Sequence, residues 1–301
     1  MRSNSNSSKS RYNEVAWPVA PSVRPWRCAE IGRAATLALH DELALAPKPG
    51  LVSFEDSGSH DDMDAHTFMR SLFALRHYFV EITELGAQQV PFAQLQACGI
   101  AAEQRMLRAT GGINTHRGAI FMLGLLCAAA GSVVATGASP TPPAIRAALQ
   151  THWGAALAQR ARQPSTLPGG IAVQRYGLRG AMQEAALAFP AVFEAGWPAW
   201  QHARLRGLSP RQTQLHSFFS LLAVLDDSNL VHRGGLAGLA FARAAARDFL
   251  QQDGAATAAG WRRAGAIHRS FVARRLSPGG TADALSATCW LARLQGAPAT
   301  R

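Results

Sequence analysis

The chain has 301 residues, of which 48% are hydrophobic and only 16% are charged. This composition supplies a real core and excludes a disordered polar chain or an ordinary coiled coil. The formal net charge is +11, and the 30 basic residues comprise 28 Arg and two Lys that are scattered rather than clustered. Scattered guanidinium groups suit phosphate-bearing small molecules at least as well as a nucleic-acid duplex.

The cysteines argue against two kinds of scaffold. Cys28, Cys98, Cys127 and Cys289 are widely spaced and form no C-x-x-C pair. Neither a thiolate zinc site nor a disulfide framework is therefore expected, and a reducing cytoplasm fits this cysteine usage best.

The ends of the chain differ from its body. Residues 1–28 are rich in Ser, Asn, Pro and Arg without a periodic apolar pattern, and they lack the apolar stretch of a secretory signal. We predict a flexible N-terminal extension over 1–28, a single all-helical catalytic domain over 29–296 and a flexible C-terminus over 297–301.

Helical periodicity dominates the body. Apolar residues three and four apart predict a first helix from Ala29, which ends before Pro47-Lys48-Pro49-Gly50 because proline interrupts helices. A second helix is expected with Asp62 as its cap, and a third after Pro91. Further helices are predicted over 119–130, 143–161, 179–195, 210–225, 236–251, 255–275 and 282–294. Because alternating strand patterns are nearly absent, we predict an all-α globule of about ten helices with functional Gly-rich loops.

One uncharged stretch, Gly118 to Ala138, is about long enough to cross a bilayer. It is rich in alanine with interspersed Gly and Ser, and no second stretch of its kind occurs. We therefore favour a buried central helix and expect no membrane.

Four Gly-Gly pairs stand out because glycine lets backbone N–H groups approach a phosphate closely, most effectively at the start of a helix. The pairs are Gly111-Gly112, Gly169-Gly170, Gly234-Gly235 and Gly279-Gly280. None matches a Walker or Rossmann fingerprint, and each taken alone is more often an ordinary turn.

The stretch after Gly112 carries dense polarity. Asn114, Thr115, His116 and Arg117 place an amide, a hydroxyl, an imidazole and a guanidinium in one short turn before the most apolar helix. Such groups are costly to bury without partners, which favours a substrate-binding turn. The alternative is that Asn114 or Thr115 caps the helix and His116 is solvated.

Two acidic loops are candidate cation sites. Asp226-Asp227-Ser228-Asn229 precedes Arg233-Gly234-Gly235, and two adjacent acids with an amide can hold Mg²⁺ while Arg233 meets phosphates. A helix that stops and restarts explains these acids nearly as well.

The other acidic loop contains His60, Asp61 and Asp62, with Asp64 expected at the surface. Acids at a helix start also favour the helix dipole without a ligand. Lys48 is a point charge suited to a phosphate, although a solvated loop lysine is the default.

Arg179 and Glu184 lie on one predicted helix. Glu184 is flanked by alanine and glutamine, so it is either a desolvated general base or a salt-bridged core acid. Near the C-terminus, Gly279-Gly280-Thr281 precedes a helix and offers N–H groups and a hydroxyl.

In order, these motifs closely resemble the triphosphoribosyl-dephospho-CoA synthases, the ATP:dephospho-CoA triphosphoribosyl transferases that serve citrate lyase and malonate decarboxylase. The matching stretches are Pro47–Val52, Gly58–Met63, Gly111–Phe121, Tyr176–Ala181 with Glu184-Ala185, Asp227–Asn229 with Arg233–Gly235, and Ser277–Gly280 with Ala282-Asp283. Departures from the family pattern fall at Ser53, Arg117 and Met182, where Asp, Lys and Arg are usual.

The resemblance implies that the 2′-hydroxyl of 3′-dephospho-CoA attacks C1′ of the ATP ribose and that adenine leaves. An α-linked product then requires inversion, as in inverting glycosidases. Glu184 or Asp227 is the expected base, and His116 would protonate or orient the leaving adenine. The expected Mg²⁺ ligands are Asp61, Asp62, Asp226 and Asp227. The expected substrate-binding residues are Lys48, His60, Asn114, Thr115, Arg117, Arg179, Asn229, Arg233, Gly234, Gly235, Gly279 and Gly280.

The resemblance also implies that the product passes to a holo-acyl-carrier-protein synthase. The composition leans towards the malonate decarboxylase branch, and a homodimer is possible. Two rival functions are a Mg²⁺-dependent N-glycosidic hydrolase similar to ADP-ribosylglycohydrolases and a nucleic-acid-binding module, which the lack of aromatics among basic residues disfavours. The transferase hypothesis requires the loops that carry the glycine pairs and their polar neighbours, here called the corners, to meet at one cleft.

Overall fold

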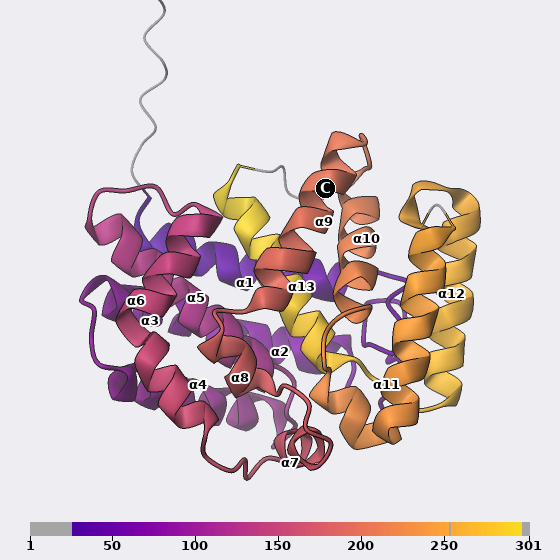
Figure 1. Cartoon of the computed structure of the whole chain (residues 1–301), viewed down its shortest axis with the longest axis horizontal. Coiled ribbons are helices and arrows are strands. Elements are labelled where there is room, and N and C mark those ends of the chain that lie inside the picture. Colours follow the sequence, from indigo (N-terminus) through magenta and orange to yellow (C-terminus); the bar gives the residue numbers. More distant parts are fainter. Residues whose placement is uncertain (1–25, 253, 297–301) are drawn as a thin grey trace, which may run out of the picture.

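The computed structural model describes residues 26–252 and 254–296, and these ranges contain helices but no strand. Figure 1 shows the helices gathered into one body. The all-α single domain is therefore confirmed, with thirteen α-helices in the described residues where about ten were expected. Residues 1–25 and 297–301, predicted to be flexible ends, lie outside the described residues.

The α-helices are α1 (Cys28–Ala44), α2 (Ala65–Leu75), α3 (Tyr78–Ala87), α4 (Phe92–Thr110), α5 (Arg117–Ala135), α6 (Pro142–Ala161), α7 (Pro168–Arg175), α8 (Ala181–Ala186), α9 (Trp197–Leu205), α10 (Pro210–Leu222), α11 (Ser228–Gln251), α12 (Ala258–Ala273) and α13 (Gly279–Leu294). A π-helix, η1 (Ala191–Gly196), precedes α9, and a short 3₁₀ helix, η2 (Gly254–Ala256), precedes α12.

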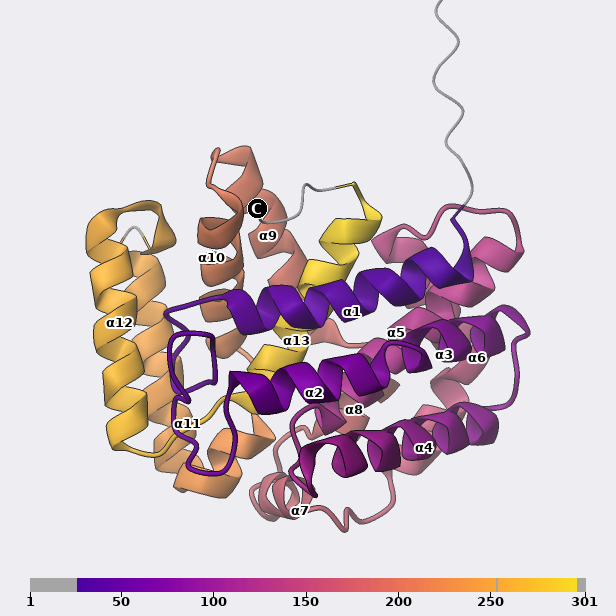
Figure 2. The same cartoon turned by 180° about the vertical axis from the view of Figure 1, so that it is seen from behind.

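Two helices form the centre of the molecule. Helix α5 packs against α1, α3, α4, α6 and α13, while α13 packs against α1, α5, α10 and α11. Seen from behind in Figure 2, α1 crosses in front of α13. Among the described helices only α5 is long and apolar enough to span a membrane, and most of it is buried inside the protein. The sequence alternative of a buried central helix therefore describes α5 correctly.

Small residues let α3 and α5 approach closely. A Cβ added to Gly86 would lie 2.0 Å from the carbonyl oxygen of Ala128, and one added to Gly131 would lie 2.0 Å from that of Thr83. The alanine- and glycine-rich composition of α5 thus creates a backbone contact that larger side chains would prevent.

Two predicted boundaries were wrong. Helix α2 is capped by Asp64, whose Oδ1 accepts a hydrogen bond from the Thr67 N–H at 2.8 Å, and not by Asp62. The helix predicted over 179–195 is broken after α8, where Ala188 and Phe189 both have positive φ. The break arises before Pro190, which has no N–H to continue the helix.

The α3–α5 contact gives a stability prediction. Replacing Gly86 with Ala forces a methyl group onto the backbone of Ala128, so the free energy of unfolding should fall by about 2–3 kcal/mol or more. Gly154→Ala in α6, where a Cβ meets only Gln150 at 3.9 Å, is the matched control and should stabilise by about 0.5–1 kcal/mol. Urea unfolding measures both variants, and equal stability of the two would contradict the close contact.

Candidate functional site

Several of the predicted corners contact one another. The Ser59 hydroxyl donates to the carbonyl of Leu276 at 2.6 Å, and Nε2 of His60 lies 2.8 Å from the hydroxyl of Ser277. The Gly169-Gly170 corner reaches the same region, since a Cβ on Gly169 would lie 3.1 Å from the hydroxyl of Ser228. Segments more than 200 residues apart therefore share one region, as the transferase hypothesis requires.

One cavity lies beside this region, and another lies away from it. One of about 350 Å³ is lined by the 56–58 loop and by His268 and Arg269 of α12. A larger one, of about 490 Å³, lies at Trp26, Pro140 and Leu294. Contacts therefore join the corners at 58–60, 169–170, 227–234 and 276–280, while the place of Gly111-Gly112 among them and a cleft centred on the corners stay predictions.

Asp227 ties two helices together at the centre of the region. It caps α11, with Oδ1 accepting from the N–H groups of Asn229 (3.0 Å) and Leu230 (3.3 Å). Its Oδ2 accepts from the N–H of Thr281 at 2.7 Å and from the Thr281 hydroxyl at 2.9 Å. The residue is 1% exposed. Since both oxygens are occupied by protein donors, this geometry argues against Asp227 as base or magnesium ligand and favours the helix-restart alternative.

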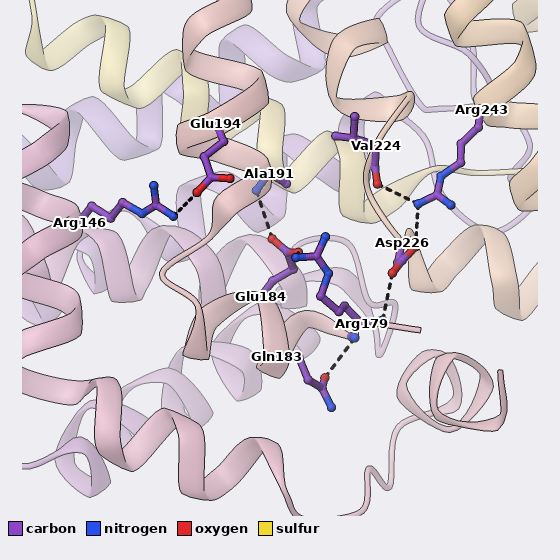
Figure 3. A network of polar contacts seen from close by, with 10 residues as sticks. Arg146, Arg179, Gln183, Glu184, Ala191, Glu194, Val224, Asp226 and Arg243 are labelled. Atoms are coloured by element: carbon purple, nitrogen blue, oxygen red, sulfur yellow. Dashed lines mark hydrogen bonds and ion pairs between the residues drawn. The ribbon is translucent and has the colours of Figure 1, made fainter. Parts of the chain in front are cut away.

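Asp226 is also engaged, as Figure 3 shows. Its Oδ2 accepts from the N–H of Arg179 at 3.0 Å, and its Oδ1 pairs with Arg243 at 2.6 Å. Arg243 also donates to the carbonyl of Val224 at 2.8 Å. Asp226 therefore fastens the loop before α8 to α11.

The other two expected magnesium ligands, Asp61 and Asp62, are exposed. Asp61 lies 3.1 Å from Arg275, and Asp62 lies 3.6 Å from Nδ1 of His60. Across residues 26–252 and 254–296, no group of three or more His, Cys, Asp and Glu side chains is placed to hold a metal ion. The four expected ligands therefore form no such group, and magnesium binding stays a prediction.

Glu184 is the predicted base that keeps acceptor capacity. It is 4% exposed; Oε2 accepts from the Ala191 N–H at 3.3 Å and Oε1 lies 3.4 Å from Nη1 of Arg179 (Figure 3). Burial raises the pKa of Glu184, and the Ala191 and Arg179 contacts oppose that shift. A buried carboxylate with a raised pKa and few donors is suited to accept a proton near neutrality.

A strained turn sets the position of Glu184. Ala188 and Phe189 adopt φ values of 54° and 51° directly after α8, and a π-helix follows. Each such non-glycine residue costs on the order of 1–2 kcal/mol, and this kind of strain and π-helical turns cluster at functional sites. The turn brings the Ala191 N–H back onto the Glu184 carboxylate.

His116 is buried at the start of α5. Its Nδ1 lies 2.6 Å from the hydroxyl of Ser71, and its ring meets the edge of Phe68 with centroids 4.9 Å apart. Burial and nearby Lys48 lower the pKa of His116 to about 3. The ring is therefore neutral at physiological pH, so of the two expected roles only orientation of the adenine, not its protonation by an imidazolium, fits the structure.

The rest of the 114–117 turn is held by protein contacts. Asn114 Oδ1 accepts from the Arg117 N–H at 3.1 Å, which is the capping alternative. The Arg117 side chain pairs with Glu103, and the Thr115 hydroxyl is buried without a hydrogen-bond partner among the described residues. Substrate binding by these three residues stays a prediction.

Lys48 does not project into solvent. Its ammonium group is buried, forms an ion pair with Glu42 and donates to the Glu42 carbonyl at 2.6 Å. Burial lowers the pKa of Lys48 and raises that of Glu42, and their mutual attraction opposes both shifts. Lys48 is therefore committed first to Glu42, so the solvated-lysine alternative is wrong and phosphate binding stays a prediction.

Arg233 and His60 link α11 to two loops. Arg233 donates to the carbonyls of Ser59 (3.1 Å) and Arg275 (3.2 Å), and it lies 3.2 Å from Nδ1 of His60. Burial and the Arg233 charge lower the pKa of His60. Just beyond Arg233 and Gly234, α11 kinks at Gly235, whose φ of 60° and ψ of −161° are accessible essentially to glycine alone.

The start of α13 lies directly against α11. A Cβ on Gly279 would lie 2.4 Å from Nδ2 of Asn229, and one on Gly280 would lie 3.3 Å from Oδ2 of Asp227. The Gly279-Gly280 pair therefore permits this close approach, whatever further role it has in binding substrate.

A family model described as ATP:dephospho-CoA triphosphoribosyl transferase matches residues 28–300. The chain belongs to this family. It is therefore a transferase, the first of the three predicted functions, and the resemblance inferred from the six motifs is confirmed.

Curated relatives agree with the family model. A 2-(5″-triphosphoribosyl)-3′-dephosphocoenzyme-A synthase of Pectobacterium atrosepticum is 39% identical over 280 residues, covering 84% of this chain and 85% of the relative. Probable synthases of the same name from Vibrio cholerae (39% over 272 residues; 87% and 86% covered) and Acinetobacter calcoaceticus (35% over 261 residues; 87% and 89%) are also similar. No solved structure matches the chain.

Sequence reasoning about the transferase missed two acids, the buried Glu42 and the partly buried Asp283. Glu42 lies on the buried face of α1, six residues before the single lysine of the described chain, and that spacing was the available signal. Asp283 falls in the last of the stretches that match the family, but no role was predicted for it. Its carboxylate faces another helix, α5, and this long-range contact had no local signal.

The transferase's Asp227 provides a test of structural against catalytic roles. In Asp227→Asn, the side-chain NH₂ would face N–H donors, so the free energy of unfolding should fall by about 2–4 kcal/mol. Urea unfolding monitored by circular dichroism measures this loss. Unchanged stability together with lost transfer would instead restore a catalytic role to Asp227.

The imidazole of His116 gives a second test. Because burial holds its pKa near 3, its ring ¹⁵N shifts should stay constant from about pH 5 to 8, where unperturbed histidines titrate. A heteronuclear NMR titration of the full chain measures this. Titration of the His116 ring within that range would mean that it can serve as an imidazolium acid after all.

Proposed function

We propose that this transferase moves the 5-triphosphoribosyl group of ATP to the 2′-hydroxyl of 3′-dephospho-CoA with inversion at C1′ and release of adenine. We further propose that the product becomes the prosthetic-group precursor of malonate decarboxylase and passes to a holo-acyl-carrier-protein synthase. The family and its relatives support the activity. The skew of the basic residues towards Arg supports the malonate decarboxylase branch.

Glu184 is the proposed general base. Nucleophilic attack by a sugar hydroxyl needs a carboxylate that can take its proton as the bond to C1′ forms. This assignment rests on the burial of Glu184, its raised pKa and its remaining capacity to accept hydrogen bonds. In Asp227, by contrast, both carboxylate oxygens already accept hydrogen bonds from the protein.

Phosphate recognition falls to the arginines of the corners. Arg179 is half exposed (49%) beside Glu184, and Arg233 lies at the kink of α11. Their guanidinium groups can bind the triphosphate and the CoA diphosphate in a bidentate manner. When Arg179 turns towards phosphate it also releases Glu184 from its ion pair.

Magnesium is proposed to arrive with ATP. Mg²⁺ is commonly bound through substrate phosphates and one or two carboxylates rather than by an all-protein cage. The exposed acids Asp61 and Asp62, next to Arg275 and His60, fit that limited role. When bound, the ion would neutralise charge on the triphosphate.

We propose the cytoplasm as the compartment. All four cysteines are free, and Cys98, Cys127 and Cys289 are buried. Free thiols suit a reducing environment.

The proposed base is tested by Glu184→Gln. Without a proton acceptor, transfer should slow by roughly 10²–10⁴-fold, measured as the CoA-sized product by mass spectrometry with ATP and dephospho-CoA. Glu194→Gln is the matched control, because Glu194 pairs with Arg146 in the same region and its side chain is 61% exposed (Figure 3). Near-normal transfer by Glu184→Gln would remove Glu184 from the base role.

The wild-type reaction separates transfer from hydrolysis. With ATP alone the transferase should release no adenine, and with dephospho-CoA it should release adenine and form the new product together. Adenine formed from ATP alone at the same rate would favour the hydrolase alternative.

A further inference from the structure

Asp283 is a carboxyl group for which the proposed mechanism has no role so far. It lies in the first turns of α13, and its carboxylate accepts a hydrogen bond from the Ala119 N–H at the start of α5. A Cβ on Gly118 would lie only 1.9 Å from Oδ2 of Asp283, so glycine is required for this approach. Unlike Asp227, Asp283 keeps part of its surface exposed.

Three carboxyls in this region, Glu42, Asp227 and Asp283, differ in their partners. Glu42 forms an ion pair with Lys48, and Asp227 accepts four hydrogen bonds. Asp283 accepts a hydrogen bond from the Ala119 N–H, and no cation in the described part of the chain forms an ion pair with it. Of several neighbouring acids, the one whose carboxylate has the fewest ion pairs and hydrogen bonds binds its proton most strongly.

The electrostatics agree with this comparison. Burial, followed by the charges of Asp227 and Glu42, raises the pKa of Asp283 well above its ordinary value. A neutral carboxyl can accept from the Ala119 N–H through its carbonyl oxygen while its O–H remains free to donate. Nearby His116 cannot supply a proton, because its ring is neutral.

We propose that Asp283 is the general acid of the transfer, giving its proton to the departing adenine. The inference rests on the proposed function. The 2′-oxygen of dephospho-CoA forms its bond to C1′ and its proton passes to Glu184. The bond between C1′ and N9 breaks, its electron pair leaves with adenine, and the Asp283 proton neutralises the ring. Exchange with solvent returns the proton from Glu184 to Asp283, so no co-reactant is consumed.

The competing role for Asp283 is purely structural, as a cap of α5 supplied by α13. Asp283→Asn separates the two roles, because asparagine still offers an oxygen to the Ala119 N–H but has no acidic proton. A cap would survive this change with little loss of transfer, whereas a general acid would not.

The decisive experiment compares two donors in the full-length Asp283→Asn variant. Transfer from ATP should fall by roughly 10²–10⁴-fold. The second donor is the ribose 5-triphosphate with a 4-nitrophenoxy group at C1′ in place of adenine. Because 4-nitrophenolate leaves without being protonated, transfer from this donor should stay within about threefold of wild type. Asp248→Asn, an exposed acid on α11, is the control. An equal loss with both donors, or near-normal transfer from ATP, would overturn the proposal.

A measurement on the wild-type protein covers the case in which the variant fails to fold. In ¹³C-aspartate-labelled protein at neutral pH, one carboxyl resonance should have the shift of a protonated acid. If every aspartate were ionised, Asp283 could not be the acid. Absence of triphosphoribosyl product from wild type would refute the proposed function instead, and it would leave this NMR result standing.

Discussion

Helices α5 and α13 begin without a capping bond from their own N-cap side chains, and this constraint shapes the site. An N-terminus leaves backbone N–H groups that must find acceptors when they are buried. Here Asn114 accepts locally from the Arg117 N–H, and two further acceptors come from other helices. Asp227 of α11 satisfies the Thr281 N–H of α13, and Asp283 of α13 satisfies the Ala119 N–H of α5.

This relay of caps holds three helix N-termini at one place. Because each N-terminus carries partial positive charge, the arrangement favours anionic ligands such as the phosphates of ATP and dephospho-CoA. The Arg233 side chain, fixed by carbonyls of two loops, adds full charge nearby. The geometry that stabilises the fold thus also creates an electrostatic setting that suits a triphosphoribosyl transferase.

Local patterns predicted the helical class and the contact between several of the corners. Periodicity identified the buried α5, and Gly-Gly pairs next to polar side chains marked the loops that converge. Such local patterns do not predict contacts between residues far apart in the sequence. Asp226 and Asp227 resemble magnesium ligands in the sequence, but their carboxylates bind Arg243 and Thr281 in the structure. The helix predicted over 179–195 was wrong because the turn at Ala188 and Phe189 overrides local helix propensity. The hydrogen bond from the Ala191 N–H to Glu184, which this turn allows, depends on the three-dimensional structure and has no sequence pattern.

Hydrogen exchange of the full chain with and without ATP tests most directly whether the three helix starts form one binding site. If they do, ATP should slow amide exchange together in 111–119, 226–235 and 276–283, which are far apart in sequence. Protection confined to one of these segments, or found only elsewhere in the chain, would contradict the account.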